Sequence, residues 1–176
     1  MKNANANHTK YLLLFFMTSI QVSISYSQTI FKSKKFGYSY NIPSGWYQKN
    51  QTYYDDVDSK FIDGKGNSFV VVAKKQYIND YGDFVKNYSV LTDEDIKDSY
   101  KNTYVKEVNI IKRGLVNFGG KNCYFIETKN ILINDGVTHT YNYYFMTANA
   151  GYSITASLIN EKYLSDINKI IKSFVF

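Results

Sequence analysis

Three turn signals in the second half of the chain separate four segments with the character of β-strands. Gly119-Gly120, Asp135-Gly136 and Asn149-Ala150-Gly151 are residue types that tight turns favour. The segments between them are rich in β-branched and aromatic residues, which favour strands. Because strands joined by short turns pair with their neighbours in antiparallel order, we expect a meander. A glycine inside a strand often marks a bulge, so we expect one at Gly114. The four strands are predicted at residues 108–118, 121–130, 137–146 and 152–158.

The segment around the only proline and the only tryptophan predicts an earlier pair of strands. Apolar residues alternate with small or polar ones over residues 36–42, a period of two that indicates a strand with one buried face. Pro43 ends that strand because it cannot donate a backbone hydrogen bond, and Ser44-Gly45 turns the chain. Trp46 then begins a short second strand. The alternating apolar residues are Phe36, Tyr38, Tyr40 and Ile42.

A polar region and a central strand follow. Residues 49–59 carry few aliphatic side chains and are predicted as a loop. The sequence Asp63-Gly64-Lys65-Gly66-Asn67 is a turn signal, and the β-branched run after it, residues 68–73, is predicted as a central strand.

Helical signals fill the middle and the end of the chain. Asp80 and Thr92 are each suited to cap a helix, with Asp83 in the first turn of the first one. The buried face of the second helix is expected at Ile96, Tyr100 and Thr103. A third helix is predicted after Asn160, and apolar residues recur in it at helical spacing. They are Tyr163, Leu164, Ile167, Ile170, Ile171 and Phe174.

The order of elements is strands, two helices, a meander and a last helix. This order predicts an α+β fold in which a central antiparallel β-sheet is flanked by helices. No repeat or linker interrupts residues 36–176, so we expect a single domain there.

The first 27 residues have the layout of a secretory signal peptide. Lys2 and Lys10 precede the apolar run of residues 11–24, and Ser25-Tyr26-Ser27 supplies small residues for cleavage before Gln28. Retention as an N-terminal membrane anchor is the alternative. Residues 28–35 are predicted to be a short linker. The chain is therefore expected to be exported, either periplasmic or secreted, with no transmembrane segment after cleavage.

Charge and cysteine content narrow the function classes. The formal net charge of +6 falls to +4 without Lys2 and Lys10, the lysines are scattered, and Arg113 is the only arginine. Since nucleic-acid binders cluster their basic residues on one face, a nucleic-acid partner is not expected. Cys123 is the only cysteine, so it either lies buried as a small hydrophobe or pairs with another chain.

Covalent catalysis finds no support in the sequence, and we expect no enzyme and no cofactor. A nucleophilic pair would need Cys123 and His139 within hydrogen-bond distance. If Asp135-Gly136 forms a two-residue hairpin, His139 pairs opposite Leu132. Cys123 lies nine residues further along that strand, roughly 30 Å away.

A metal site is not predicted either. Asp55, Asp56, Asp58 and Asp63 cluster in the sequence, but a calcium loop that starts at Asp63 would have Lys74 at its twelfth position, where a glutamate is required. We therefore interpret residues 63–67 as an ordinary turn. Paired carboxylates for hydrolysis remain open, although the acidic residues sit at expected caps and turns.

The mature chain resembles the PsbP-like or Mog1-like superfamily, which includes exported bacterial PsbP-related and DcrB-like proteins. The resemblance covers residues 36–174. It implies a central antiparallel sheet between helices, and a role as an accessory or adaptor protein with no shared catalytic residue. The matching segments are Ile42-Pro43-Ser44-Gly45-Trp46, Phe69-Val70-Val71-Val72, Tyr124-Phe125-Ile126, Tyr141-Asn142-Tyr143-Tyr144-Phe145 and Ile170-Ile171-Lys172-Ser173-Phe174.

Three functional hypotheses follow from the sequence. The first is an exported, non-enzymatic accessory protein that binds a protein partner through loop aromatics, with Tyr53, Tyr54, Asp55 and Asp56 as the candidate contact residues. The second is a carrier of an apolar small molecule, which requires a tyrosine-lined cavity of some hundreds of cubic ångströms between the sheet and the helices. The third is a carboxylate-based hydrolase, which requires two acids that converge in a cleft.

Overall fold

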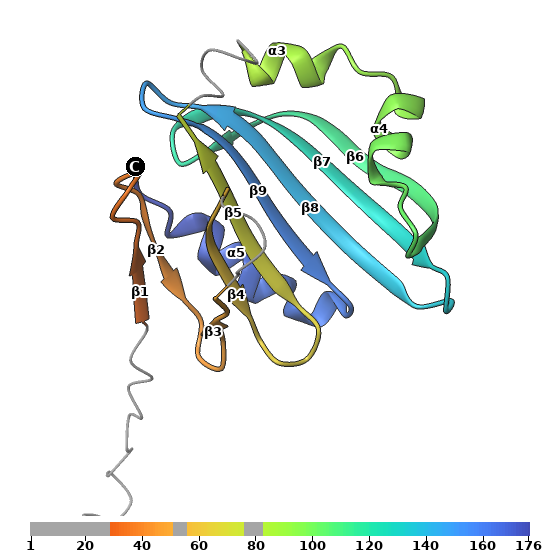
Figure 1. Ribbon diagram of the computed structural model, residues 1–176, viewed down its shortest axis with the longest axis horizontal. Coiled ribbons are helices and arrows are strands. Elements are labelled where there is room, and N and C mark those ends of the chain that lie inside the picture. The colour runs from red at the N-terminus through yellow and green to blue at the C-terminus, as the bar shows by residue number, and fades with distance from the viewer. Residues whose placement is uncertain (1–28, 51–55, 76–82) are drawn as a thin grey trace, which may run out of the picture.

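A seven-stranded antiparallel sheet forms the centre of the computed structural model, which describes residues 29–50, 56–75 and 83–176 (Figure 1). The strand order is β3-β4-β5-β9-β8-β7-β6, so the last four strands form the predicted meander and β9 pairs with β5. The strands are β3 (Tyr47–Gln48), β4 (Val57–Ile62), β5 (Ser68–Lys74), β6 (Val105–Phe118), β7 (Lys121–Leu132), β8 (Val137–Met146) and β9 (Gly151–Leu158).

The two faces of this sheet are covered by different elements, which gives three layers (Figure 1). Helices α3 (Phe84–Ser89) and α4 (Asp93–Tyr100) lie on one face. The other face carries α5 (Leu164–Lys172), preceded by the 3₁₀ turn η1 (Glu161–Tyr163), and the hairpin of β1 (Thr29–Lys32) and β2 (Ser39–Ile42). The predicted α+β fold is confirmed. None of the described helices is long and apolar enough to cross a membrane.

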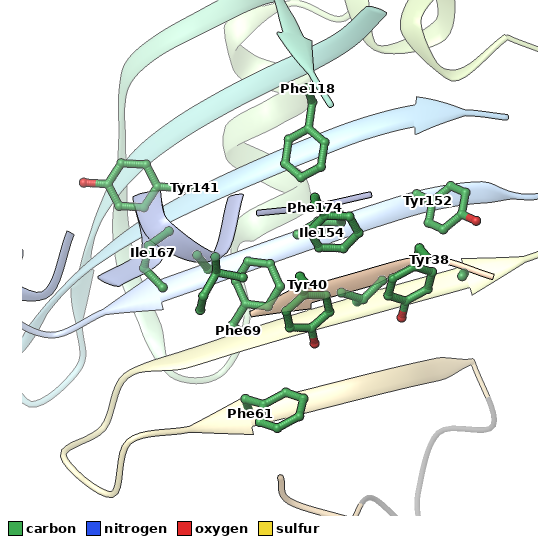
Figure 2. Close-up of a cluster of buried hydrophobic side chains, with 14 of the residues drawn as sticks. Tyr38, Tyr40, Phe61, Phe69, Phe118, Tyr141, Tyr152, Ile154, Ile167 and Phe174 are labelled. Atoms are coloured by element: carbon green, nitrogen blue, oxygen red, sulfur yellow. The ribbon is translucent and has the colours of Figure 1, made fainter. Parts of the chain in front are cut away.

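The larger core lies between the sheet and the layer formed by α5 and β2 (Figure 2). Phe174, which follows α5, stacks on both Tyr40 and Tyr38, with ring centroids 4.8 and 5.2 Å apart. Phe69 of β5 and Ile154 of β9 are fully buried beneath them. The aromatic alternation of residues 36–42 therefore supplies one wall of the core.

The segment around Pro43 behaves largely as predicted. Phe36, Tyr38, Tyr40 and Ile42 are all buried, although β2 begins only at Ser39 because residues 34–36 form a turn. Gly45 adopts a φ of 83°, which a side chain would disfavour. Trp46 belongs to the core and is 8% exposed.

The predicted linker at residues 28–35 is wrong for its central part. Residues 29–32 form β1, which pairs with β2 in the register Phe31 to Tyr40. The Phe31 ring lies 5.3 Å from the Tyr40 ring and 5.6 Å from the Phe61 ring. Backbone pairing with β2 and the contacts of the Phe31 ring together attach the segment to the core. The signal peptide lies outside the described residues and stays a prediction.

Several boundaries also differ from expectation. Strand β4 begins at Val57, so the predicted loop at 49–59 is too long at its end. Gly114 pairs with Phe125 in an uninterrupted register, and the irregularities of β6 lie instead near residues 106 and 111. Thr103 is exposed because Lys101 already has an extended backbone that ends α4.

The helix caps are mostly where the sequence placed them. Thr92 forms a capping box with Asp95 at the start of α4, and Asn160 caps η1 ahead of α5. Asp83 is itself the N-cap of α3, whereas Asp80 lies outside the described residues.

Candidate functional site

A cavity of about 580 Å³ lies between the sheet and helices α3 and α4. We call it the α3/α4 cavity. Its volume is in the range of small-molecule sites, and its described lining is mainly aromatic and aliphatic. Two depressions of similar volume have lysine and other polar residues in their walls and lack this apolar lining. The α3/α4 cavity is lined by Val72, Phe84, Asn87, Tyr88, Leu91, Ile96, Ser99, Tyr100, Ile126, Tyr144 and Ser153.

Strand register builds the floor of the cavity. Tyr144 of β8 pairs with Ser153 of β9, which in turn pairs with Val72 of β5. Residues paired across a sheet point to the same face, so these side chains form one row beneath the helices. Ile126 of β7 lies in the next row, opposite Asn142. Because the strands alternate, the neighbouring residues of each strand face the larger core.

Arg113 links the two helices that cover the cavity to the sheet. From β6 its guanidinium Nη1 donates to the Leu91 carbonyl at 2.5 Å, and its Nη2 lies 2.9 Å from Asp93 Oδ1. Leu91 and Asp93 flank the junction between α3 and α4. Sequence reasoning did not find this role. The hint in the sequence was a lone arginine within a predicted strand. In the structure Arg113 pairs with Ile126 of β7 and lies on the face of the sheet where Ile126 lines the cavity.

The hydroxyl groups of three tyrosines lie close together in this cavity. The rings of Tyr88 and Tyr144 stack with centroids 3.8 Å apart and an interplanar angle of 14°. The Tyr144 hydroxyl oxygen is 3.3 Å from that of Tyr100 and also hydrogen-bonds to Tyr88. Burial raises the pKa of Tyr100 to about 12 and raises the pKa of Tyr144 well above its usual value. Both phenols are therefore neutral at physiological pH.

A row of buried polar side chains continues from the cavity floor along β7 and β8. Asn130 Nδ2 donates to Thr140 Oγ1 at 3.0 Å, and Thr155 Oγ1 donates to Asn142 Oδ1 at 2.8 Å. Three buried atoms in this row have no hydrogen-bond partner among the described residues. They are Thr128 Oγ1, Asn130 Oδ1 and Asn142 Nδ2.

The buried Thr128 hydroxyl, which has no hydrogen-bond partner among the described residues, leads to a prediction about the stability of the protein. Valine has the same shape, so Thr128→Val removes a desolvated hydroxyl without opening a cavity, and we expect the free energy of unfolding to rise by about 1 kcal/mol. Urea unfolding measures the change. Thr140→Val is the matched control, because the Thr140 hydroxyl accepts a hydrogen bond and its loss should destabilise. A destabilised Thr128→Val protein would show that the hydroxyl is hydrogen-bonded.

Of the four predicted partner-binding residues, only Asp56 lies among the described residues. Tyr53, Tyr54 and Asp55 lie outside the described residues, so their role stays a prediction. Asp56 forms an ion pair with Lys74 at the start of β4, and it does not line the cavity.

Cys123 and His139 are far apart, although the predicted register was wrong. His139 pairs with Lys129 rather than with Leu132, because the last pair of β7 and β8 is Ile131 with Val137, so five residues separate the paired ends instead of two. Cys123 is six residues from Lys129 along β7, a separation of roughly 20 Å. Cys123 is buried, and burial raises the pKa of its thiol to about 12. His139 Nδ1 instead lies 3.1 Å from Glu161 Oε1.

Asp63 stabilises its own turn. Its Oδ1 accepts hydrogen bonds from the backbone amides of Lys65 and Asn67 at 2.8 and 3.1 Å, and its Oδ2 accepts one from Asn67 Nδ2 at 2.6 Å. Across the described part of the chain, no group of three or more His, Cys, Asp or Glu residues is placed to hold a metal ion. None of the described residues that line the α3/α4 cavity is acidic.

No protein-family model matches the sequence, and no functionally curated protein matches it. Solved structures do match. Cyanobacterial PsbP (CyanoP) from Synechocystis sp. PCC 6803 superposes with a TM-score of 0.62 at 16% identity, covering 87% of this chain and 95% of that one. The chain has the PsbP/Mog1-like fold.

Two further structures share this fold. The Ran-binding protein Mog1p of Saccharomyces cerevisiae matches with a TM-score of 0.54 at 7% identity, over 84% of this chain and 94% of its own. A protein from Bacteroides thetaiotaomicron VPI-5482 matches with a TM-score of 0.59 at 14% identity, over 84% of this chain and 48% of its own. At these identities the similarity establishes the fold of the PsbP/Mog1-like chain, and its function has to be argued from its own site.

Proposed function

We propose that this protein is an exported, non-enzymatic accessory protein, and that its α3/α4 cavity binds an uncharged apolar small molecule. The cavity itself carries the proposal, since it has the volume and apolar lining of a ligand site. Export is supported by the predicted signal peptide in residues 1–27. A binding role without catalysis is supported by a lining of described residues that contains no acid, histidine or cysteine.

Filling part of the cavity should weaken ligand binding. Ser153 lies on the floor, and Ser153→Ile projects three additional carbon atoms into the space. We expect the affinity for N-phenyl-1-naphthylamine, an uncharged fluorophore that brightens in apolar sites, to fall by about tenfold or more. Fluorescence titration of the purified mature protein measures it.

Ser157→Ile is the matched control. Ser157 lies on the same strand and the same face as Ser153, four residues further on, and does not line the cavity. It should bind the fluorophore as the unmodified protein does. Absence of binding to the unmodified protein, or equal binding by both variants, would contradict a ligand site in the α3/α4 cavity.

The edge strand β6 favours a second candidate function, the binding of a protein partner. Strand β6 ends the strand order of the sheet, so one of its sides is free of a neighbouring strand in the described structure. Its Ile111 and Leu115 are exposed, and Tyr104 and Ile133 extend this apolar surface beside its start. A long edge of this kind accepts an added strand from another chain. The yeast protein Mog1p, which has the same fold, is a Ran-binding protein.

Affinity capture from the native envelope or medium tests this second function. A partner recovered with the unmodified protein should be lost with Leu115→Lys, because a charge on the apolar edge opposes docking. Ile30→Lys is the control, since Ile30 is also exposed but lies on β1, outside the seven-stranded sheet that β6 ends. A partner that remains bound to Leu115→Lys would exclude the edge as its docking surface.

A further inference from the structure

Three buried side chains, each with an unsatisfied polar atom, lie in one row beside the floor of the α3/α4 cavity. They are Thr128 and Asn130 of β7 and Asn142 of β8, and each is more than nine-tenths buried. Their atoms Thr128 Oγ1, Asn130 Oδ1 and Asn142 Nδ2 have no hydrogen-bond partner among the described residues. Buried polar atoms in folded proteins are nearly always hydrogen-bonded, so three exceptions in one row indicate a site that another group completes.

Asn142 is the member of this row that lies nearest to the cavity. It pairs with Ile126 across β7 and β8, and it is two residues from Tyr144 on the same face of β8. Both of these neighbours line the cavity, although Asn142 itself does not. Paired residues on one face of a sheet have their Cβ atoms about 5 Å apart. The end of a ligand in the cavity therefore has only one neighbouring side chain to pass before it reaches Asn142 Nδ2.

The strand register places Thr128 and Asn142 where one atom can bridge them. Asn130 and Thr140 are diagonal neighbours across β7 and β8, and Asn130 Nδ2 donates to Thr140 Oγ1 at 3.0 Å. Thr128 and Asn142 are diagonal neighbours in the same sense, two residues closer to the cavity, but Thr128 Oγ1 and Asn142 Nδ2 form no such bond. Because the two diagonals are equivalent in the sheet, a single oxygen atom between these two side chains can bond to both.

The hydrogen-bonding capacity of the row has a direction. Asn142 Nδ2 can only donate, because Asn142 Oδ1 is the atom that accepts from Thr155 Oγ1. Asn130 Oδ1 can only accept, and the Thr128 hydroxyl between them can do both. An atom that accepts from Asn142 and donates to Thr128 leaves the Thr128 proton on the side of Asn130. A hydroxyl group meets both requirements, whereas an ether or carbonyl oxygen can only accept.

Resting on the proposed small-molecule function, we infer that the ligand is a neutral alcohol. Its apolar body fills the α3/α4 cavity, and its hydroxyl group binds between Asn142 Nδ2 and Thr128 Oγ1. The described residues that line the cavity carry no charge, so a charged end group would lose its water without meeting a counter-ion. The cavity and the polar row beside it thus form one site with an apolar part and a hydroxyl-binding part.

Two isomers test this preference for a hydroxyl group. 1-Octanol and 1-methoxyheptane contain the same atoms in chains of the same length, but only the alcohol can donate a hydrogen bond. Each is titrated against N-phenyl-1-naphthylamine bound to the mature protein at neutral pH, and the loss of fluorescence gives its affinity. We expect 1-octanol to bind about threefold to tenfold more tightly than 1-methoxyheptane, the effect of one additional hydrogen bond.

Thr128→Val assigns the preference to the polar row. Valine keeps the shape of the side chain, and the variant is expected to be more stable than the unmodified protein, so a folding defect does not obscure the result. Its affinity for 1-octanol should fall by about threefold to tenfold, with little change for 1-methoxyheptane. Thr138→Val is the matched control, because Thr138 lies on the same face of β8 as Asn142 and does not line the cavity. It should alter neither affinity.

Asn142→Leu is the second variant, and it removes the donor on the other side of the gap. It should also lose about threefold to tenfold in 1-octanol affinity. Retained binding of the fluorophore shows that the variant is folded. A structural threonine or asparagine that bound no ligand would change the stability of the protein without changing its preference between the two isomers.

The outcomes separate the proposed function from the inferred ligand class. If the unmodified protein does not bind the fluorophore, the proposed small-molecule function fails. If it binds the fluorophore but takes 1-methoxyheptane as well as 1-octanol, only the inferred ligand class fails. If folded Thr128→Val and Asn142→Leu proteins keep the full preference for 1-octanol, the polar row does not bind the hydroxyl group, and the inference is overturned in favour of ordered water at these atoms.

Discussion

The protein is expected to lose its stability steeply above about pH 10. Burial raises the pKa values of Tyr38, Tyr40, Tyr143 and Tyr144 above the ordinary value of 10.0. In the unfolded chain these phenols ionise near pH 10, whereas in the folded protein they keep their protons. Their contribution is therefore complete below pH 10 and is lost as the pH rises toward the folded pKa values. In this range each such tyrosine lowers the free energy of unfolding by about 1.4 kcal/mol per pH unit. The four together lower it by roughly 5 kcal/mol per pH unit.

A loss of that size is comparable with the whole stability of a domain. Urea unfolding between about pH 9 and pH 11 measures the slope, and the ultraviolet absorbance of phenolate shows when the tyrosines ionise. Tyr40→Phe should reduce the slope by about one proton, because it removes one buried phenol. Ionisation of all tyrosines near pH 10 in the folded protein would contradict the predicted burial effect.

Replacing Trp46 by alanine is expected to cost about 3–5 kcal/mol of unfolding free energy. The indole is 8% exposed and belongs to the larger core, next to the turn that Gly45 makes after β2. Removing it leaves a cavity at the end of that core, which the surrounding strands cannot close without moving. Urea unfolding, followed by circular dichroism because the variant lacks tryptophan, measures the loss.

Tyr47→Ala controls for a general effect of truncation in this segment. Tyr47 is the next residue and its side chain is mostly exposed, so its loss should change stability by less than about 1 kcal/mol. A Trp46→Ala protein that keeps its stability and loses a binding partner would move Trp46 from the core to an interface.

The sequence predicted the elements well where turn residues and periodicity agree. The turns at 119–120, 135–136 and 149–151 placed all four strands of the meander, because glycine, asparagine and aspartate adopt turn conformations that other residues disfavour. Alternation over residues 36–42 identified the buried face of β2 correctly. Both signals depend on neighbouring residues alone, and the structure confirms the strands that they predicted.

Features that depend on distant contacts could not be predicted in this way. Strand β1 pairs with β2, and its Phe31 contacts the rings of Tyr40 and Phe61, but nothing in the lysine-rich sequence around Phe31 indicates these contacts. The register at His139 depends on the five residues between the paired Ile131 and Val137, whereas the Asp135-Gly136 pair alone indicated a two-residue turn. The α3/α4 cavity had been anticipated only as a class of site, since its walls come from four strands and two helices.

The pairing of β2 with the residues after α5 has a consequence for how the chain matures. Ser39 exchanges backbone hydrogen bonds with Val175, and the Asn41 amide donates to Ser173 Oγ across 132 positions of sequence. The rings of Tyr38 and Tyr40 gain their stacking partner Phe174 only when nearly the whole domain has been synthesised. Early segments of the nascent chain consequently cannot settle into their final packing, because contacts at such separations form late. If the chain is exported as we propose, late completion of this packing would favour its passage through a translocation channel in an unfolded state.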